Sequence, residues 1–422
     1  MSGVGAVMGA QDRKALLQRE ERAGQSGGMK RFSMPPSDPA FVQDPYPFYD
    51  RLRAGGRMVH WEELDLPVIA GHDGVSMALR DTRFGREAPE GFAPAIPDHL
   101  RPFYEIEAHS MLELEGERHR RLRSLVLRAF TSRRVRALLP DLEEITDGLI
   151  DRFPAGEAFD LLPAFCQQVP IRVISRLLGV PEEMGPRLLG WSHAMVAVYT
   201  PTRTRAMEEA AARAATEFAE FLRGYVEERR ARPADDLITH LIAAESEGER
   251  LSTDELISTC VLLLNAGHEA TVHALGLAVK TLLERRTPPA FLGADRIDGT
   301  VEELLRFDPP LHLFQRWVNE DTVFLGQELK RGDRIGLLLG AANRDDDAWD
   351  DPHAFDPARK VKQNMSFGAG LHFCVGAPLA RLEMRVALPR LFDRCPGLHL
   401  TEPPVYADTW HFHGLDRLMV RL

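Results

Sequence analysis

Residues 367–378 place one cysteine, Cys374, in a loop that contains three glycines, directly before a stretch that predicts a helix. Gly368, Gly370 and Gly376 can adopt backbone conformations that other residues avoid, so this loop can turn tightly and aim N–H groups at the cysteine sulfur. The positive end of the following helix would favour the thiolate over the thiol. A stabilised, sheltered thiolate is a ligand for a soft metal or for haem iron.

The run from Phe367 to Gly376 reads Phe-Gly-x-Gly-x-His-x-Cys-x-Gly, and Pro-Leu-Ala-Arg follows closely. A lone cysteine is more often a small buried apolar residue, but this pattern is long and specific. It resembles the haem-binding loop of the cytochrome P-450 family, in which a cysteine thiolate is the proximal iron ligand. The resemblance implies haem b (iron protoporphyrin IX) bound through Cys374, with Phe367, Gly368 and His372 among the haem contacts.

A long helix is predicted from about residue 253 to 285, because Ser252 and Glu255 match a capping box and no proline interrupts the stretch. In its middle, Gly267 should cost about 1 kcal/mol relative to alanine. Close approach of the backbone to a flat ligand would explain why a glycine stands there.

Residues 266–271 read Ala-Gly-His-Glu-Ala-Thr and resemble the oxygen-binding helix of the same family, usually Ala-Gly-x-(Asp/Glu)-Thr. The resemblance implies that Ala266 and Gly267 form the dioxygen groove and that Glu269 helps to deliver protons. The hydroxyl expected next in the pattern is replaced by the methyl group of Ala270, which cannot hydrogen-bond.

Thr271 carries a hydroxyl one residue further on, about 100° around the helix. A local π-bulge could rotate that hydroxyl into place. Alternatively, ordered water or a substrate hydroxyl replaces the missing alcohol, which is the hypothesis we favour, or oxygen activation is impaired and the reaction is unusual. Glu269 and Thr271 are therefore the candidate catalytic residues.

Basic side chains are the candidates for binding the haem propionates. A helix predicted from 117 to 130 puts His119 and Arg123 on one face, because they are four residues apart. The resemblance implies that this pair holds a propionate, for which charge-assisted donors are suited, and that Arg316 contacts a propionate as well. Family members often carry a histidine where this chain has Asn364, so one ionic partner is expected to be missing.

Glu303 and Arg306 are three residues apart on a predicted helix, and Arg359 follows in a Phe-Asp-Pro-Ala-Arg run. An acid–arginine pair of this spacing is weak evidence alone, since surface pairs are common. The resemblance implies a buried acid–arginine network of all three residues, whose task is structural support of the haem loop.

The sequence indicates the residues that contact the substrate less clearly than the haem contacts. The resemblance implies that Leu313 and Phe314 point toward the substrate-binding space. A hairpin predicted over residues 409–414 would insert Trp410 and Phe412, although ordinary packing explains them equally well. These apolar side chains weakly indicate a small apolar substrate.

Seven arginines lie between residues 118 and 134, in a chain whose net charge is −11. The stretch is either a solvated helix face or a positive docking patch for an acidic ferredoxin. No flavin or ferredoxin sequence is fused to the chain. The resemblance therefore implies electrons from a separate ferredoxin and ferredoxin reductase.

The composition, 44% hydrophobic and 27% charged over 422 residues, is typical of a soluble globular protein. Its acidic balance argues against a nucleic-acid or anionic-membrane partner, and no apolar run approaches the roughly 20 residues of a membrane span. Four cysteines without CxxC spacing indicate reduced thiols. We expect a cytoplasmic monomer, with residues 1–33 as a disordered leader and 34–422 as one haem domain.

The expected fold is mainly α-helical with small β-sheets, with an irregular proline-rich loop at residues 87–110 over the haem. The expected function is a monooxygenase that inserts one atom of O₂ into a small-molecule substrate. Two alternatives stay open. One is a haem-thiolate enzyme with peroxide-driven, isomerase or dehydratase chemistry, and the other is a non-enzymatic haem sensor or carrier.

Overall fold

The computed structural model describes residues 28–422 except 201–202, 247–248, 362 and 411. Most of the predicted leader thus lies outside the described residues. Arg31–Phe32, however, form strand β1 and pair in parallel with strand β2, Val59–Trp61. Ordered structure therefore begins before residue 34, which corrects the predicted boundary.

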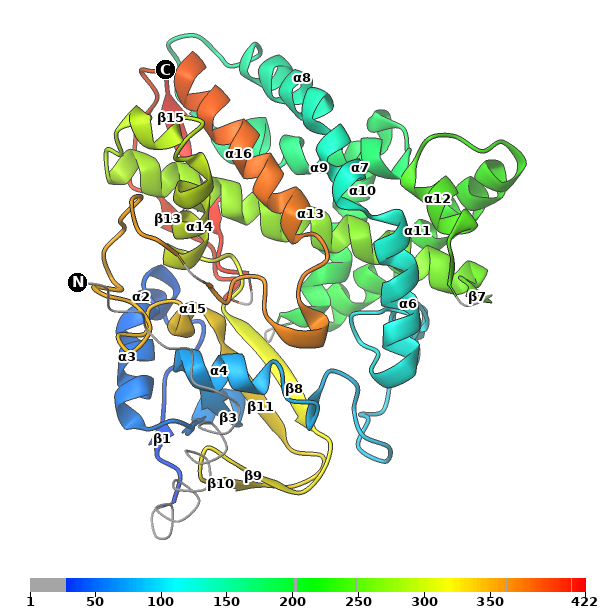
Figure 1. The fold of residues 1–422 in the computed structure, drawn as a ribbon, viewed down its shortest axis with the longest axis vertical. Coiled ribbons are helices and arrows are strands. Elements are labelled where there is room, and N and C mark those ends of the chain that lie inside the picture. The colour runs from blue at the N-terminus through cyan, green and yellow to red at the C-terminus, as the bar shows by residue number, and fades with distance from the viewer. Residues whose placement is uncertain (1–27, 201–202, 247–248, 362, 411) are drawn as a thin grey trace, which may run out of the picture.

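Helices build one half of the molecule and a twisted sheet the other, as Figure 1 shows. This arrangement confirms the expected fold of helices with small sheets. The α-helices are α2 (Pro39–Gln43), α3 (Tyr46–Gly55), α4 (His72–Ala78), α5 (Arg101–Glu107), α6 (Gly116–Ala129), α7 (Ser132–Ala137), α8 (Leu139–Ile150), α9 (Gln168–Leu178), α10 (Gly185–Val196), α11 (Arg205–Ala231), α12 (Leu237–Ala243), α13 (Thr253–Glu284), α14 (Ile297–Phe307), α15 (Leu339–Ala342) and α16 (Ala377–Arg394).

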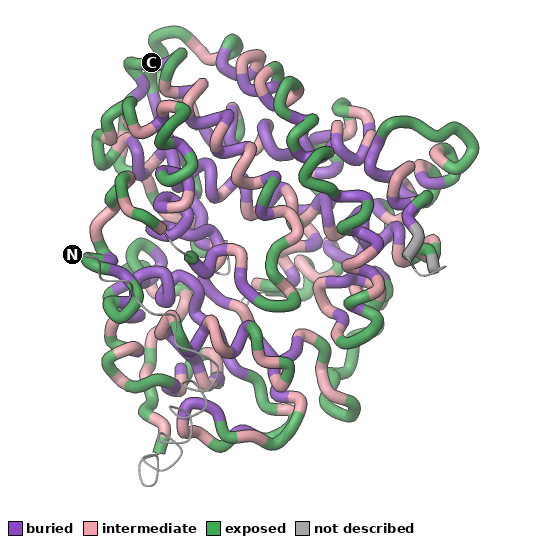
Figure 2. Tube along the Cα trace, in the orientation of Figure 1, coloured by how far each residue is buried: buried purple, intermediate pink, exposed green. Residues whose placement is uncertain are grey.

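Helix α13 crosses the helical half and packs against α5, α9, α10, α11, α14 and α16. The Ser252 hydroxyl accepts the Glu255 backbone N–H at 3.2 Å, and the Glu255 carboxylate accepts the Ser252 N–H at 2.9 Å. This capping box confirms the predicted start of the helix. Most of α13 is buried, as the purple tube in Figure 2 shows, so tertiary packing supplies most of its stability.

The main sheet has six strands in the order β1-β2-β3-β11-β8-β4. Beyond β1 and β2 its members are β3 (Leu66–Ile69), β4 (Phe84–Gly85), β8 (Leu313–Val318) and β11 (Arg334–Leu338). β2 and β3 are antiparallel. Smaller sheets pair β9 (Thr322–Phe324) with β10 (Gln327–Leu329), β13 (Val405–Tyr406) with β14 (Leu415–Arg417), β6 (Glu245–Ser246) with β7 (Glu249–Arg250), and β15 (Met419–Arg421) with both β12 (His399–Leu400) and β5 (Phe159–Asp160).

The stretch 87–110, predicted to be irregular, contains helix α5. Phe103 and Ile106 of that helix are buried, and α5 packs against α11 and α13. The several prolines around this segment obscured a helix that forms because its apolar side chains are covered by two longer helices. Within the described part of the chain, no helix combines the length and the apolar composition needed to span a membrane.

Candidate active site

Cys374 lies in the loop that leads directly into α16. Its backbone N–H donates to the Phe367 carbonyl at 3.0 Å, which closes the loop on itself. The N–H groups of Gly376 and Ala377 both donate to the Cys374 sulfur. Burial raises the pKa of the thiol, and these two bonds together with Arg123 and Arg381 work against that rise. The pKa of Cys374 stays above its ordinary value, but the loop supplies two N–H donors that favour the thiolate.

Cys374 differs from the other cysteines in its exposure to solvent. Cys166, Cys260 and Cys395 are buried, whereas the Cys374 side chain is exposed. Burial, together with the negative charge of Asp236, raises the pKa of the Cys260 thiol to about 12, so that thiol is inert at neutral pH. A sulfur that is surrounded by protein yet still accessible, with two N–H donors aimed at it, fits an iron ligand.

Two glycines of the loop have left-handed backbone conformations. Gly370 has a φ of 70°, and a Cβ atom there would collide with the backbone carbonyl oxygen of Leu79. Gly368 has a φ of 67°, and its Cβ would lie 3.2 Å from the Phe314 ring. At these positions glycine is required by both backbone conformation and space, which explains the pattern seen in the sequence.

His119 and His372 lie together beside the loop. Their rings stack with centroids 4.2 Å apart, and His372 Nε2 lies 2.9 Å from a carboxylate oxygen of Glu115. His119 is buried, and neither of its ring nitrogens has a hydrogen-bond partner among the described residues. Burial, with His372 nearby, lowers the pKa of His119 to about 4, so the ring is neutral at pH 7. A neutral ring can still donate one hydrogen bond to a propionate, so the predicted role of His119 stays a prediction.

Glu115 was not found from the sequence, because it lies outside every recognisable motif. Burial raises its pKa, but bonds from His372 and from the Arg86 backbone N–H bring the pKa below the ordinary value. The structure thus gives His372 a carboxylate partner within the protein itself.

Arg123 and Arg316 are the two cations of the predicted propionate set. Arg123 donates to the Phe373 carbonyl at 2.6 Å, next to the cysteine. Arg316 is buried and makes no ion pair with any described residue; it donates to the neighbouring Gln315 carbonyl at 2.8 Å. Burial lowers the pKa of Arg316 to about 9, so it stays charged at pH 7. A buried guanidinium without an acid partner and an imidazole with two unpaired nitrogens fit a ligand that carries carboxylates.

The structure brings Glu303, Arg306 and Arg359 together. Arg306 donates to both carboxylate oxygens of Glu303, at 2.7 and 2.8 Å, and Arg359 donates to one of them at 3.2 Å. Glu303 and Arg306 are completely buried. Breaking such a buried network typically costs about 3–5 kcal/mol. Asn364 does not join the propionate set, because its amide donates to Glu302 at 3.1 Å.

The distal motif lies in the middle of α13. Ala266 is exposed and Gly267 half-buried, although the helix around them is mostly buried. A Cβ at Gly267 would meet only Ile174, at an ordinary 3.5 Å. Protein packing therefore does not demand the glycine, which leaves close approach of a ligand as its reason.

Helix α13 is regular through this region, so the π-bulge hypothesis is wrong. The Thr271 hydroxyl donates to the Gly267 carbonyl one turn earlier at 3.2 Å, and Thr271 is buried. Its hydroxyl is thus engaged with the helix backbone, while Ala270 offers none.

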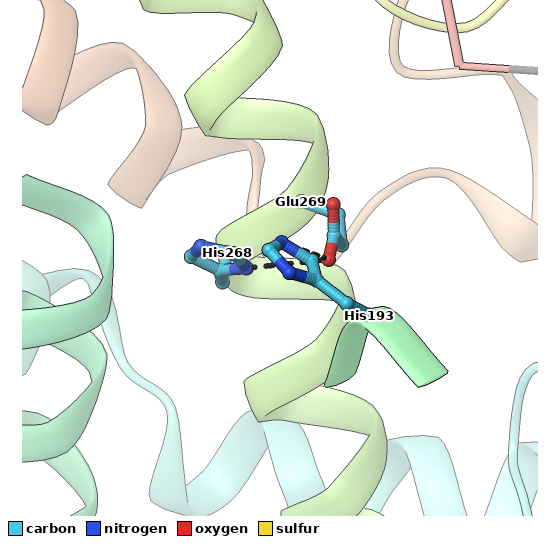
Figure 3. A group of neighbouring side chains, drawn as sticks. All are labelled: His193, His268 and Glu269. Atoms are coloured by element: carbon cyan, nitrogen blue, oxygen red, sulfur yellow. Dashed lines mark ion pairs between the residues drawn. The ribbon is translucent and has the colours of Figure 1, made fainter. Parts of the chain in front are cut away.

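Glu269 is buried, and three groups converge on its Oε1 atom: His193 Nε2 at 3.2 Å, Ser192 Oγ at 3.4 Å and His268 Nδ1 at 3.6 Å. Figure 3 shows His193 reaching across from α10. Burial raises the pKa of Glu269, and His193 and Ser192 partly offset the rise. His193 carried no signal in the sequence, because only the packing of α10 on α13 brings it to the motif.

Two groups of side chains lie close enough together to hold a metal ion. One is His193, His268 and Glu269, and the other is Asp308, His312 and His413. In the second group the Asp308 carboxylate is bonded to two tyrosines and His312 to a third, which is the arrangement of a buried structural network.

The predicted substrate residues are not brought together. Leu313 and Phe314 are neighbours in β8 and so point to opposite faces: Leu313 is in the aromatic core cluster of the N-terminal region, and Phe314 packs beside Gly368. Trp410 is also in that cluster, with its indole N–H donating to Tyr49 at 2.8 Å. The predictions that Leu313 and Trp410 line the pocket are corrected accordingly. The Phe412 ring lies 5.8 Å from His273 of α13.

Comparison with known proteins decides the family. The family model described as Cytochrome P450 matches residues 297–406. The chain is 36% identical to the cytochrome P450 monooxygenase PikC of Streptomyces venezuelae over 397 residues, 90% of this chain and 92% of the relative. It is 34% identical to 6-deoxyerythronolide B hydroxylase of Saccharopolyspora erythraea over 400 residues, 91% of this chain and 97% of the relative.

The protein belongs to the cytochrome P450 family. Its fold agrees: the structure of the Bacillus subtilis cytochrome P450 PksS has a TM-score of 0.83 and 32% identity, covering 92% of this chain and 99% of that one. It is therefore a P450 monooxygenase that binds haem b through an axial cysteine thiolate. When bound, the haem supplies the activation of O₂.

A matched pair of glycine variants tests how the cysteine loop of this P450 is held. Gly116→Ala adds a methyl group at a φ of 61° with no atom within 4 Å, so it should cost only the left-handed strain of about 1–2 kcal/mol. Gly370→Ala adds the collision with Leu79 and should cost about 1–3 kcal/mol more. Urea unfolding and haem content measure the difference. Equal losses in the two variants would contradict the loop geometry described above.

Proposed function

We propose that Cys374 is the thiolate ligand of the haem and that the protein inserts one oxygen atom from O₂ into a small apolar substrate. The single observation that carries this proposal is an accessible sulfur that accepts two backbone N–H groups. The other three cysteines are buried, which supports the accessible Cys374 as the ligand.

The remaining haem contacts are proposed from the donors around the loop. Arg123 and Arg316 would hold propionates as cations, and His119 would add a hydrogen bond as a neutral ring. His372 would contribute from the same side while Glu115 orients its ring. Phe367 and Gly368 would form the surface next to the sulfur, as the resemblance of the loop implies.

On the opposite side we assign the dioxygen groove to Ala266 and Gly267 and proton delivery to Glu269. The raised pKa of Glu269 supports this role, because a carboxyl that holds its proton nearer neutral pH is a better general acid. We assign Thr271 a positioning role, since its hydroxyl is bonded to the Gly267 carbonyl. Water or a substrate hydroxyl would complete the proton path beside Ala270.

The electron donor is proposed to be a ferredoxin that docks over the cysteine loop and α6. Arg120, Arg128 and Arg133 are exposed, and no ion pair joins them to any described residue. Leu371 and Phe373 of the cysteine loop are exposed, and Arg123 of α6 donates to the Phe373 carbonyl. An apolar centre with a basic rim complements an acidic partner.

The substrate class is proposed from two of the predicted substrate contacts, Phe314 and Phe412. Phe314 and Phe412 are apolar, and Phe412 lies against α13 near the distal motif. One relative is a 6-deoxyerythronolide B hydroxylase, which supports hydroxylation of a small molecule as the reaction type.

Isotopic oxygen tests the reaction directly. Compounds are first screened for displacement of the water on the haem iron, seen as a shift of the absorption spectrum. Turnover of a hit with ferredoxin, ferredoxin reductase and ¹⁸O₂ should give product that contains one ¹⁸O atom. Product without ¹⁸O, or turnover without any electron donor, would contradict the proposed monooxygenase reaction.

Charge reversal tests the docking surface. Arg128→Glu should slow reduction of the haem by ferredoxin roughly three- to tenfold at low salt, because it replaces attraction by repulsion. The effect should shrink as salt screens the charges. The control Lys330→Glu makes the same charge change beside β10, where Lys330 pairs with Asp321 at the sheet end. Equal slowing in both variants would exclude α6 as the docking site.

A further inference from the structure

Glu269 needs a source of protons, because its carboxyl group is buried and a proton given to the distal side must be replaced. The neighbouring position, Ala270, has no hydroxyl, and the Thr271 hydroxyl is bonded to the Gly267 carbonyl. No side chain of the motif itself therefore connects Glu269 to solvent. The side chains that face the Glu269 carboxylate therefore determine how it is reprotonated.

Three histidines face Glu269, two from its own helix and one from α10. His268 Nδ1 lies 3.6 Å from Oε1, His273 Nε2 lies 4.0 Å from Oε2, and His193 Nε2 lies 3.2 Å from Oε1. Ser192 completes the set at 3.4 Å from Oε1. Only His193 combines a short distance with contact to solvent: its side chain is 51% exposed, and that of His268 is completely buried.

The two histidines of α13 are poor proton carriers. Burial lowers the pKa of His268 to about 3 and that of His273 to about 4, so both rings are neutral near pH 7. Both His268 nitrogens also lack a hydrogen-bond partner among the described residues. Neither ring is placed to take a proton from water and pass it on.

We propose that His193 is the residue through which protons from solvent reach Glu269, passing from His193 Nε2 to Glu269 Oε1. The imidazolium of His193 gives its Nε2 proton to the carboxylate, and the ring becomes neutral. A water molecule at the exposed edge returns a proton to the ring, so one proton moves from solvent to Glu269 per cycle with no change in electrons. Figure 3 shows the direct approach of the two side chains.

The inference rests on the proposed role of Glu269 and adds a positioning residue on a second helix. Because α10 carries His193 and packs on α13, the distance between His193 and Glu269 depends on how closely these helices approach. Proton supply to Glu269 therefore depends on how closely α10 packs against α13. A substrate that holds α10 against α13 would also complete the proton path.

Two variants of His193 separate proton transfer from simple charge. His193→Gln removes both the charge and the titrating group. His193→Arg keeps a positive charge beside Glu269 but does not release a proton near neutral pH. The control His240→Gln removes a surface histidine of α12 that pairs with Asp235 at 3.1 Å, away from the site.

The first measurement needs no turnover. In the reduced carbon monoxide complex of the holoenzyme, the carboxylic acid C=O band of Glu269 is followed by infrared spectroscopy against pH and identified by its loss in Glu269→Gln. His193→Gln should raise the pKa of Glu269, since the imidazolium lowers it in the wild type, while His193→Arg should not raise it. An unchanged titration in His193→Gln would overturn the proposal, because the two groups would then not interact.

The second measurement is the amount of product formed per pair of electrons consumed. Both His193 variants should lower it about tenfold, less than the roughly 10²–10⁴-fold of a direct acid–base group, because water can replace His193 inefficiently. His240→Gln should match the wild type.

Recovery of the yield in His193→Arg would overturn the proposal, since charge alone would then suffice. An unchanged yield in His193→Gln would overturn it as well. Failure of the proposed monooxygenase function looks different: the wild type itself would form no product labelled from O₂, whereas the infrared titration would still report the contact between His193 and Glu269.

Discussion

The structure depends on keeping a sulfur atom negative inside a protein. Burial raises the pKa of Cys374 and so opposes the thiolate. The N–H groups of Gly376 and Ala377, at the start of α16, and the guanidinium groups of Arg123 and Arg381 act in the opposite direction. Each of these groups comes from an element that must be held at a fixed distance from the loop, and much of the fold serves that purpose.

The acid–arginine network reaches the cysteine loop through a chain of contacts. Arg306, bound to Glu303, also donates to the Asn343 carbonyl at 2.9 Å. The Asn343 side chain in turn accepts the Met365 N–H at 2.6 Å and donates to the Ser366 hydroxyl at 2.9 Å. The buried charges thus fix the backbone immediately before Phe367. This explains how Glu303, far from the sulfur in sequence, can support the loop without taking part in chemistry.

Features determined by neighbouring residues could be predicted from the sequence. The capping box of α13 and the glycines of the cysteine loop are of this kind, because their geometry depends on a few consecutive positions. The resemblance of the motifs to a known family supplied the cofactor and the order of the site residues.

Features that depend on packing between distant segments could not be predicted in this way. The neutrality of His119 comes from its burial against His372, and the place of Trp410 comes from the aromatic cluster around Tyr49. The contact of His193 with Glu269 exists only because α10 lies on α13. Helix α5 was missed because its apolar face is short and prolines surround it. In each case the deciding information was the tertiary neighbour.

The most direct test of the account is the absorption spectrum of the reduced carbon monoxide complex in Cys374→Ser. The account predicts that the thiolate-type band of the wild type disappears, because the alcohol of serine cannot replace the thiolate on the iron. Cys395→Ser, a change at a buried cysteine at the end of α16, should keep the band. Persistence of the band in Cys374→Ser would contradict the assignment on which the rest of the site depends.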